Sequence, residues 1–300
     1  MKALIIGSEG NIGKPLVKHL KSLQYEVMEV DIKQGWRPNY LVADITNPID
    51  LIPAFVDFEP DVVFMLSAMV SRVTCEQAPS LAVSTNLLGL QNVLEMCKRF
   101  NSKCIYFSTS EVYGPDCDVM DESLSDPKPN NRYGLSKLLG ERLVEYEVQQ
   151  HGFRAVTLRP FMMYDEHEEL GDHRSAMIRF ATNLAEGKEI EVHLGSERAW
   201  LHVSDAVRAI EKAAHLDEYS VINIGQGDFR SIKELADLIC EKLGANPHLI
   251  QEIDLPSRMT LKKRPTLDRM NQLLGCPPQV SFDEGVEKVC QVIKSRIQKL

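Results

Sequence analysis

The sequence places a phenol, an amine and two hydroxyls where they could move a proton. Tyr133 and Lys137 stand four positions apart in RYGLSK, and on a helix this spacing puts both side chains on one face. Thr109, Ser110 and Glu111 stand together in FSTSEVYG, at the end of the apolar run CIYF. Such residues contribute little to an apolar core, so their clustering indicates either turn chemistry or a reaction.

A tyrosine and a lysine so placed could act as a proton-transferring pair. A phenol is a poor base at neutral pH, because its pKa in model peptides is about 10. A nearby ammonium favours the phenolate, so Lys137 should lower the pKa of Tyr133 toward the working range. The Y-x-x-x-K spacing alone usually marks an amphipathic surface, so its meaning depends on the rest of the chain.

The segment GSEGNIG, residues 7–13, has the composition of a phosphate-binding turn. Gly7, Gly10 and Gly13 follow the apolar run 3–6 and lead into a predicted helix. Glycines there permit a tight turn, a close approach of the backbone to a pyrophosphate and close helix–strand packing, while the helix N-terminus offers free N–H groups. A glycine triplet is a weak signal by itself, and a turn without a ligand remains the alternative.

Two acids strengthen the interpretation as a dinucleotide site. Asp31 ends the second predicted strand, 18 positions after Gly13, where a carboxylate can accept from both ribose hydroxyls. It would repel the additional phosphate of NADP, which favours NAD. Asp44, in VADITN, could bond the adenine amino group or merely form a turn, and the sequence leaves both open. Strand, glycine turn, helix, strand and acid together predict dinucleotide binding.

Short apolar runs alternate with amphipathic segments over the first half of the chain. The expected strands are 3–6, 25–31, 61–68, 103–108, 154–160 and the later SVINIG; the expected helices are 11–24, 79–100, 132–152, 176–187, 202–215, 231–244 and 281–300. Such alternation predicts an α/β fold, a Rossmann-like doubly wound parallel sheet with a smaller C-terminal substrate-binding lobe. Ser231 with Glu234, and Ser281 with Glu284, have the spacing of helix capping boxes.

The alternation of strands and helices ends after Pro160, where MYDEHEELGDHRS is polar and irregular. We therefore expect a division of the chain into a nucleotide-binding core, an interleaved lobe and a final helix. The predicted ranges are 1–165 with about 203–225 for the NAD-binding core, 166–202 and 226–280 for the substrate-binding lobe, and 281–300 for the C-terminal helix.

Composition excludes several classes of protein. The 300 residues are 44% apolar and 26% charged, as is usual for a globular chain. A net charge of −9 argues against nucleic-acid binding and against anionic membranes. The seven cysteines include no CxxC pair, which favours reduced thiols over a disulfide framework or a metal site. No signal peptide or membrane span is predicted, so we expect a cytoplasmic protein.

With these motifs the chain resembles the extended short-chain dehydrogenase/reductase family, in particular its NAD-dependent nucleotide-sugar epimerases and dehydratases. The resemblance covers nearly the whole chain through GSEGNIG, Asp31, MLSAMV (65–70), TNLLGLQNVLE (85–95), FSTSEVYG, YGLSK, LRPF (158–161), RAWLHVSDAV (198–207) and NIG (223–225). The residues it implies for the cofactor, together with the acids above, are Gly7, Gly10, Asn11, Ile12, Gly13, Asp31, Asp44, Ile45, Ser67, Ala68 and Lys137.

The resemblance also implies a reaction on a nucleotide-diphosphate sugar. Tyr133, Lys137 and Thr109 match the family's catalytic set. Tyr133 would take the proton of the sugar C4 hydroxyl and Thr109 would hold that oxygen, while hydride passes to NAD and later returns from it. Segments 79–100 and 132–152 resemble helices that pair between two subunits, which implies a homodimer.

Glu111 bears on which reaction of this family the chain would perform. Its 4,6-dehydratases and UDP-glucuronate decarboxylases tend to carry Thr-Asp-Glu or Thr-Ser-Glu, and Thr109-Ser110-Glu111 is what stands here. A carboxylate there could take the C5 proton for elimination or assist decarboxylation, with Ser110 donating a hydrogen bond. The alternative activity is that of a UDP-sugar 4-epimerase, and the alternative role of Glu111 is to cap a turn. A non-catalytic dinucleotide sensor and an NADP-linked reductase fit the residues less well.

Several further residues are candidates for contacts with the substrate. Arg198 matches a family arginine that contacts the diphosphate or a reacting carboxylate, and Arg264 lies near a second one. Met69, with Met162 and Met163, could make the sugar pocket apolar. We expect Asn86 and His202 to be structural. RPFMMYDEH departs from the RPFNVYGP of most relatives, which puts the geometry of the substrate loop in doubt.

Overall fold

The protein is described by a computed structural model that covers residues 1–115, 117, 119–124, 126–168, 175–254 and 261–297. Within these ranges a seven-stranded sheet has the order β11-β6-β5-β4-β1-β2-β3, and each neighbouring pair is parallel. The strands are β1 Lys2–Ile6, β2 Glu26–Asp31, β3 Tyr40–Val42, β4 Val62–Met65, β5 Lys103–Phe107, β6 Ala155–Pro160 and β11 Val221–Ile224. The predicted parallel sheet is confirmed.

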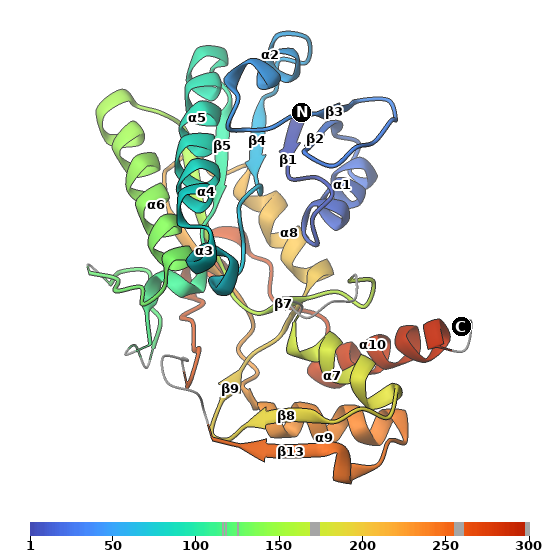
Figure 1. Ribbon diagram of the computed structural model, residues 1–300. Helices are drawn as coiled ribbons and strands as arrows, with labels where there is room; N and C mark the ends of the chain where they lie inside the picture. The colour runs from blue at the N-terminus through green and yellow to red at the C-terminus, as the bar shows by residue number, and fades with distance from the viewer. Residues whose placement is uncertain (116, 118, 125, 169–174, 255–260, 298–300) are drawn as a thin grey trace.

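Helices cover both faces of the sheet (Figure 1). One face packs against α1 (Gly13–Ser22) and α8 (Val203–Ala213), and the other against α2 (Pro48–Val56), α5 (Gly89–Phe100) and α6 (Arg132–His151). Successive residues of β1 alternate between the two cores, because side chains along a strand point to opposite faces. The buried strands are therefore apolar on both sides, as their sequences predicted.

The order of the strands reverses at β1, which pairs with β2 on one side and β4 on the other. In open parallel sheets, ligands bind beside the carboxyl ends of the strands at such a reversal. The turn at Gly7 follows β1, Asp31 ends β2, Ser67 follows β4 and Thr109 follows β5. The topology thus collects the candidate residues of four strands along one edge of the sheet.

The segment predicted as a single helix over 79–100 is interrupted. It consists of α4 (Pro79–Val83), a π-helical turn η1 (Ser84–Leu88) and α5, and the short helix α3 (Arg72–Gln77) precedes it. The buried Asn86 lies in the π turn, where its amide bonds the backbone of Met69 and the hydroxyl of Ser136. A π turn of this kind often accommodates a functional contact that a regular helix would misplace.

The C-terminal lobe has a core of its own beneath the sheet edge (Figure 1). It is built from α7 (Ala176–Ala185), α9 (Ile232–Leu243), α10 (Phe282–Ile297) and the parallel pair β8 (Ile190–His193) and β13 (Ile250–Ile253). Ser231 and Glu234 form the predicted capping box, and Ser281 exchanges the equivalent bonds with Glu284. Both helix starts that the sequence indicated are confirmed.

Several short elements complete the fold. They are the 3-10 turns η2 (Ser110–Tyr113) and η3 (Pro247–Leu249), the π turn η4 (Met270–Leu274), the parallel pair β7 (Met163–Tyr164) with β10 (Leu201–His202), and the antiparallel pair β9 (Glu197–Arg198) with β12 (Arg230–Ser231). The predicted irregular segment 163–175 and the predicted helix 281–300 extend partly outside the described residues.

Two properties bear on the setting of the protein. Among the described residues, no helix combines the length and apolarity that a bilayer crossing requires. The seven cysteines, all within the described ranges, are free thiols, and all except the half-buried Cys117 are buried.

Candidate active site

The start of α6 positions Tyr133 and Lys137. The Asn131 side chain caps the helix by accepting from the Gly134 backbone N–H at 2.9 Å. A side chain at Gly134 would lie 2.7 Å from the Glu111 carbonyl oxygen, so glycine allows the first turn of α6 to lie directly against η2. The two motifs that the sequence singled out are therefore packed against each other.

Thr109 and Tyr133 meet at this contact. Thr109 is buried, adopts extended backbone angles as the cap of η2, and accepts from the Glu111 N–H at 3.3 Å. Burial raises the pKa of Tyr133 to about 12, a hydrogen bond with Thr109 lowers it, and the Glu111 carboxylate raises it. Thr109 is thus placed to share with Tyr133 the oxygen of a bound alcohol.

Lys137 lies one helical turn further on and is buried. Its ammonium nitrogen is 4.4 Å from the centre of the Tyr106 ring, and burial lowers its pKa to about 7 although Glu141 raises it. The lowering of the Tyr133 pKa that the sequence suggested is not seen in the protein without cofactor. Desolvation and the Glu111 charge outweigh the hydrogen bond with Thr109, so the phenol is protonated at neutral pH. For the protein with NAD bound, where the positive nicotinamide ring adds to Lys137, the lowering stays a prediction.

Glu111 lies among cations contributed by distant segments. Its carboxylate pairs with the Lys263 ammonium, accepts from Asn131 Nδ2 at 2.9 Å and lies 4.0 Å from Arg72 Nη1. Burial by itself would raise the pKa of Glu111, but Lys263, Arg72 and Asn131 together hold it below its usual range. Ser110, also buried, accepts from Lys263 at 3.5 Å. Glu111 is therefore a carboxylate at neutral pH.

The sequence interpretation missed Lys263 and named the neighbouring Arg264 as a candidate phosphate contact. Lys263 is buried beside Glu111, whereas Arg264 pairs with Glu197, as Lys262 does at 3.3 Å. Alternate residues of an extended segment point in opposite directions, so in LKKRPT the middle cation faces away from the other two. That alternation is the signal that could have identified Lys263.

Arg198, the other predicted substrate arginine, joins the Glu111 cluster. It is buried on β9 and donates to the carbonyls of Glu197 at 2.7 Å and Leu261 at 2.8 Å. Burial lowers its pKa to about 10, Glu111 raises it and Arg72 lowers it. Arg198 therefore brings buried positive charge to the site, and Arg264 remains with Glu197 outside it.

The glycine turn fits a dinucleotide. Gly7 has a φ of +94°, and a side chain there would lie 2.8 Å from the Ser67 nitrogen; one at Gly13 would lie 2.2 Å from the Gly7 carbonyl oxygen. Gly10 differs, because among the described atoms its added Cβ would meet only that same oxygen, at 3.3 Å, and the residue is exposed. Two glycines serve the turn, and the third leaves open a cradle that a pyrophosphate could enter.

The other candidate cofactor residues surround this turn. The Asp31 carboxylate accepts from the backbone of Glu9 at 2.8 Å and of Lys33 at 3.0 Å. Asp44 accepts from the Thr46 N–H and hydroxyl, which makes it a turn residue whatever else it binds. The remaining candidates are the exposed Asn11, the half-buried Ile12, Ser67, Ala68 and Met69, and the buried Ile45.

Four other candidates have structural partners. Asn86 bonds protein groups, as described above, in agreement with its predicted role. Met162 packs against the lobe core and Met163 against the core of the sheet, so neither supports the predicted apolar sugar pocket. The buried His202 caps α8, contacts Ser204 at 2.7 Å and pairs with Glu166 at 2.7 Å. It is structural, as the sequence suggested.

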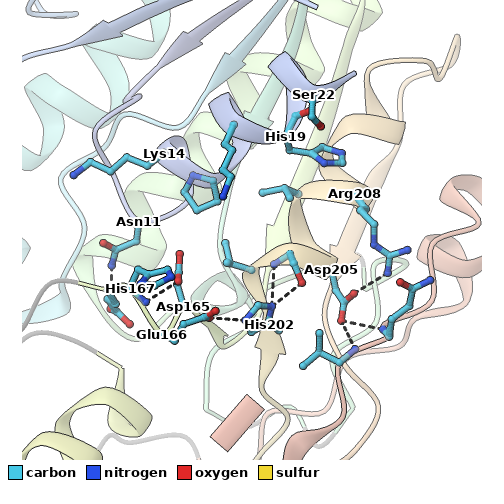
Figure 2. A pocket seen from close by; sticks show the side chains of 18 of the residues that line it. Asn11, Lys14, His19, Ser22, Asp165, Glu166, His167, His202, Asp205 and Arg208 are labelled. Carbon is cyan, nitrogen blue, oxygen red and sulfur yellow. Dashed lines mark hydrogen bonds and ion pairs between the residues drawn. The ribbon is translucent and has the colours of Figure 1, made fainter. Parts of the chain in front are cut away.

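A separate cavity of about 700 Å³ lies between α1, α8 and the turn that precedes α10 (Figure 2). Its lining includes Lys14 and His19 of α1, the His202–Glu166 pair and Arg208, which pairs with Asp205 at 2.7 Å. Tyr133, Lys137 and Glu111 are not among its lining residues. This cavity is therefore distinct from the cluster that could do chemistry.

Comparisons with known proteins agree with this geometry. The chain is 28% identical to a UDP-N-acetyl-alpha-D-glucosaminuronate decarboxylase of Bacillus cytotoxicus, over 97% of each chain, and 25% identical to UDP-glucuronic acid decarboxylase 1 of Danio rerio, over 99% of this chain and 73% of the other. A UDP-glucose 4-epimerase of Thermus thermophilus, solved in complex with NAD, superposes with a TM-score of 0.85 at 25% identity and covers 98% of this chain and 99% of its own. The sequence profile described as NAD dependent epimerase/dehydratase family matches residues 3–225. By this match, and by its strand order and glycine turn, the chain belongs to the NAD-dependent epimerase/dehydratase family.

Proposed function

We propose that this chain decarboxylates a nucleotide-linked uronic acid of the UDP-glucuronate class. The observation that carries the proposal is the excess of positive charge around Glu111. Among the described residues Lys263, Arg198 and Arg72 approach this one carboxylate. Cations gathered in one partly buried site favour the binding of an anion among them. The carboxylate of a uronate would supply it, and a neutral hexose would not.

The position of the cluster supports a carboxylate on the sugar. Glu111 and Ser110 directly follow Thr109, and Lys263 contacts both of them. Thr109 in turn is hydrogen-bonded to Tyr133. If the C4 oxygen of the sugar lies between Thr109 and Tyr133, the substituent of the adjacent C5 faces these cations. A diphosphate would lie further away, across the sugar ring.

The ion pair also favours decarboxylation over elimination. Elimination of water needs a base that removes the C5 proton, and the Lys263 ammonium makes Glu111 a weaker base by holding its pKa down. Loss of CO2 from a 4-keto uronate needs no base at C5, because the electrons of the C5–C6 bond move toward the C4 oxygen. The hydroxyls of Thr109 and Tyr133 could stabilise the charge that develops on that oxygen. The enolate that results then takes a proton from water at C5.

Each residue then has a defined part in the reaction. After passing its own proton to Lys137, Tyr133 takes the proton of the C4 hydroxyl and returns it at the end, and Thr109 keeps that oxygen in place. Lys137, adjacent on the same helix, provides a nearby proton-accepting or proton-donating group because its pKa is about 7. NAD, held by the glycine turn and Asp31, supplies when bound the hydride acceptor and donor and a positive charge near the phenol.

Incubation with three sugars tests the proposal. UDP-glucuronate or its N-acetylated amino analogue should release CO2 and give a UDP-pentose or UDP-4-keto-pentose, seen by NMR. UDP-glucose should not be consumed. Inversion at C4 of UDP-glucose would instead identify a 4-epimerase, and loss of water from a UDP-hexose would identify a dehydratase. Either result without CO2 release from a uronate would refute the decarboxylase.

We also propose that the active form is a homodimer. Leu81 and Val83 of α4, Leu88 of η1, and Leu135 and Leu139 of α6 are each between 45% and 54% exposed. These helices lie side by side (Figure 1), so together they form one apolar face. Leu135→Glu with Leu139→Glu should halve the mass measured by sedimentation. A wild-type protein that sediments as a monomer at micromolar concentration would refute the dimer.

A further inference from the structure

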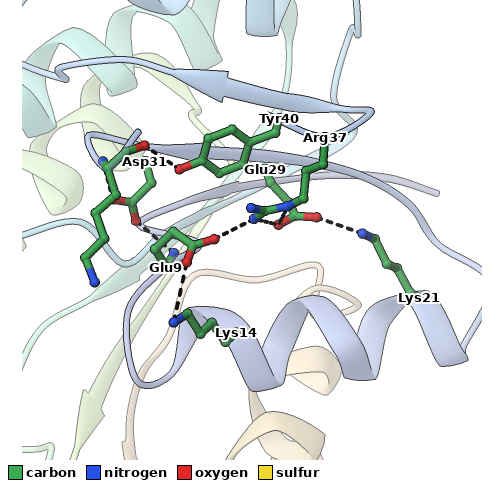
Figure 3. A network of polar contacts seen from close by, with 8 residues as sticks. Glu9, Lys14, Lys21, Glu29, Asp31, Arg37 and Tyr40 are labelled. Atoms are coloured by element: carbon green, nitrogen blue, oxygen red, sulfur yellow. Dashed lines mark hydrogen bonds and ion pairs between the residues drawn. The ribbon is translucent and has the colours of Figure 1, made fainter. Parts of the chain in front are cut away.

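Arg37 lies beside the proposed ribose site, and two carboxylates already bind its guanidinium. Arg37 follows β2 on the loop that leads to Tyr40, and its guanidinium lies 4.0 Å from the centre of the Tyr40 ring (Figure 3). The Glu9 N–H, in the glycine turn, donates to Asp31 at 2.8 Å. The Glu9 carboxylate accepts from Arg37 Nη2 at 2.6 Å. Glu9 thus contacts both Arg37 and Asp31, the acid that would bind the ribose.

A second carboxylate, that of Glu29, holds the same guanidinium. Arg37 Nε donates to Glu29 Oε2 at 3.0 Å, and Nη2 pairs with the same oxygen. Glu29 is buried on β2 and also accepts from Lys21 at 2.7 Å. The hydrogen bond to Glu29 is the main cause that raises the pKa of Arg37. The guanidinium is therefore shared between two carboxylates from different segments.

This arrangement matters for the choice between NAD and NADP. The two cofactors differ in a phosphate on the adenosine ribose, and arginine is the side chain best shaped to bind a phosphate through two parallel hydrogen bonds. A phosphate arriving beside Asp31 could not make two parallel hydrogen bonds to Arg37 as it stands, because Nη2, which both such pairs of donors include, already donates to Glu9 and Glu29. It would have to displace Glu9 or Glu29 while being repelled by Asp31.

We propose that Glu9 and Glu29 make Arg37 unavailable to a ribose phosphate, so that three carboxylates, rather than Asp31 alone, exclude NADP. Glu9 and Glu29 act here as specificity-determining residues through the arginine between them. The proposal concerns the cofactor and does not depend on the substrate suggested above.

The test is a double-mutant cycle on dinucleotide-free protein. NADH binding is followed by its fluorescence, and NADP+ and NAD+ are compared as displacing ligands. Glu9→Gln with Glu29→Gln should improve the affinity for NADP+ relative to NAD+ by about tenfold, the size expected for one released charge-assisted contact. Arg37→Gln should change this ratio little in the wild type and should abolish the gain in the double variant. Glu26→Gln, an exposed residue of the same strand, controls for net charge.

Each outcome decides the question. An unchanged ratio in the double variant would overturn the proposal, and so would an equal gain in Glu26→Gln. Arg37→Gln could instead lower the affinity for NADP+ by the same factor in the wild type and in the double variant. In that case Arg37 acts only through its charge, and Glu9 and Glu29 do not keep it from the phosphate. Should Glu29→Gln unfold the protein, Glu9→Gln alone, with and without Arg37→Gln, completes the same cycle. Retained NADH binding separates these results from a failure of the cofactor site.

Discussion

Lys263 and Glu111, 152 positions apart in the chain, form a buried ion pair at the end of β5. Glu111 belongs to the sheet core, and Lys263 arrives on the extended segment that runs back from the lobe, where Met120 and Pro265 form a bridge. The charge of the candidate active site is therefore complete only when these two parts of the chain are packed together.

Replacing Lys263 should damage both stability and catalysis. Lys263→Gln leaves a largely buried carboxylate without its main partner. Loss of one member of a buried pair usually costs roughly 3–5 kcal/mol; we expect about 2 kcal/mol here, because Glu111 keeps Asn131 and its side chain is 14% exposed. Urea unfolding measures this change. Lys262→Gln is the matched control, since it loses only a more exposed pair with Glu197; equal losses in both would contradict the special place of Lys263.

Tyr133→Phe should abolish turnover and retain the cofactor. The substitution removes the hydroxyl that exchanges a proton with the substrate, and general acid–base catalysis of this kind contributes about 10²- to 10⁴-fold. Bound dinucleotide, released by denaturation and quantified by absorbance, should be unchanged. Tyr146→Phe, on the exposed side of the same helix, serves as control. Turnover close to that of wild type would remove Tyr133 from the mechanism.

Lys137 should give the cofactor-free protein an unusual pH dependence. Its pKa is lowered to about 7 by burial, from an ordinary value of 10.5. Between these values the unfolded chain binds a proton that the folded one does not, so the free energy of unfolding rises with pH, by at most about 1.4 kcal/mol per pH unit. The slope is measured by urea unfolding between pH 7 and about 8.5, below the main titration of cysteine thiols.

Lys137→Met should flatten this slope. Lys103, whose pKa is lowered to about 8, contributes in the same direction and is present in both proteins. A slope that is identical in wild type and Lys137→Met would mean that Lys137 keeps its charge in the folded protein.

Two glycines of the turn should separate folding from cofactor binding. Gly13→Ala would bring a methyl group within 2.2 Å of the Gly7 carbonyl oxygen, so the protein should lose several kcal/mol of stability or fail to fold. Gly10→Ala meets only one described atom, at 3.3 Å, and should fold with an unchanged melting temperature. It should nevertheless bind NADH at least tenfold more weakly, because the methyl group occupies the phosphate cradle. Normal NADH affinity in Gly10→Ala would move the pyrophosphate away from this turn.

The sequence predicted the local parts of the site well, because their signals are local. The glycine turn, the acid at the end of β2 and the Tyr133–Lys137 spacing each depend on residues that are close in the chain. The capping boxes at Ser231 and Ser281 were found for the same reason. The π turn inside 79–100 was not predicted, since the buried polar contacts of Asn86 that accompany it come from segments outside the helix.

The amino-acid sequence by itself determined the alternation of strands and helices, the edge of the sheet at which the candidate residues gather and the dinucleotide signature, because these follow from periodicity and turn geometry. Only the tertiary structure decided that Lys263 accompanies Glu111, that burial raises the pKa of Tyr133 in the protein without cofactor, and that Arg37 is shared by Glu9 and Glu29. The physical reason is common to all three. Burial and charge pairing depend on which distant segments meet, and the spacing of residues along the chain does not indicate which segments these are.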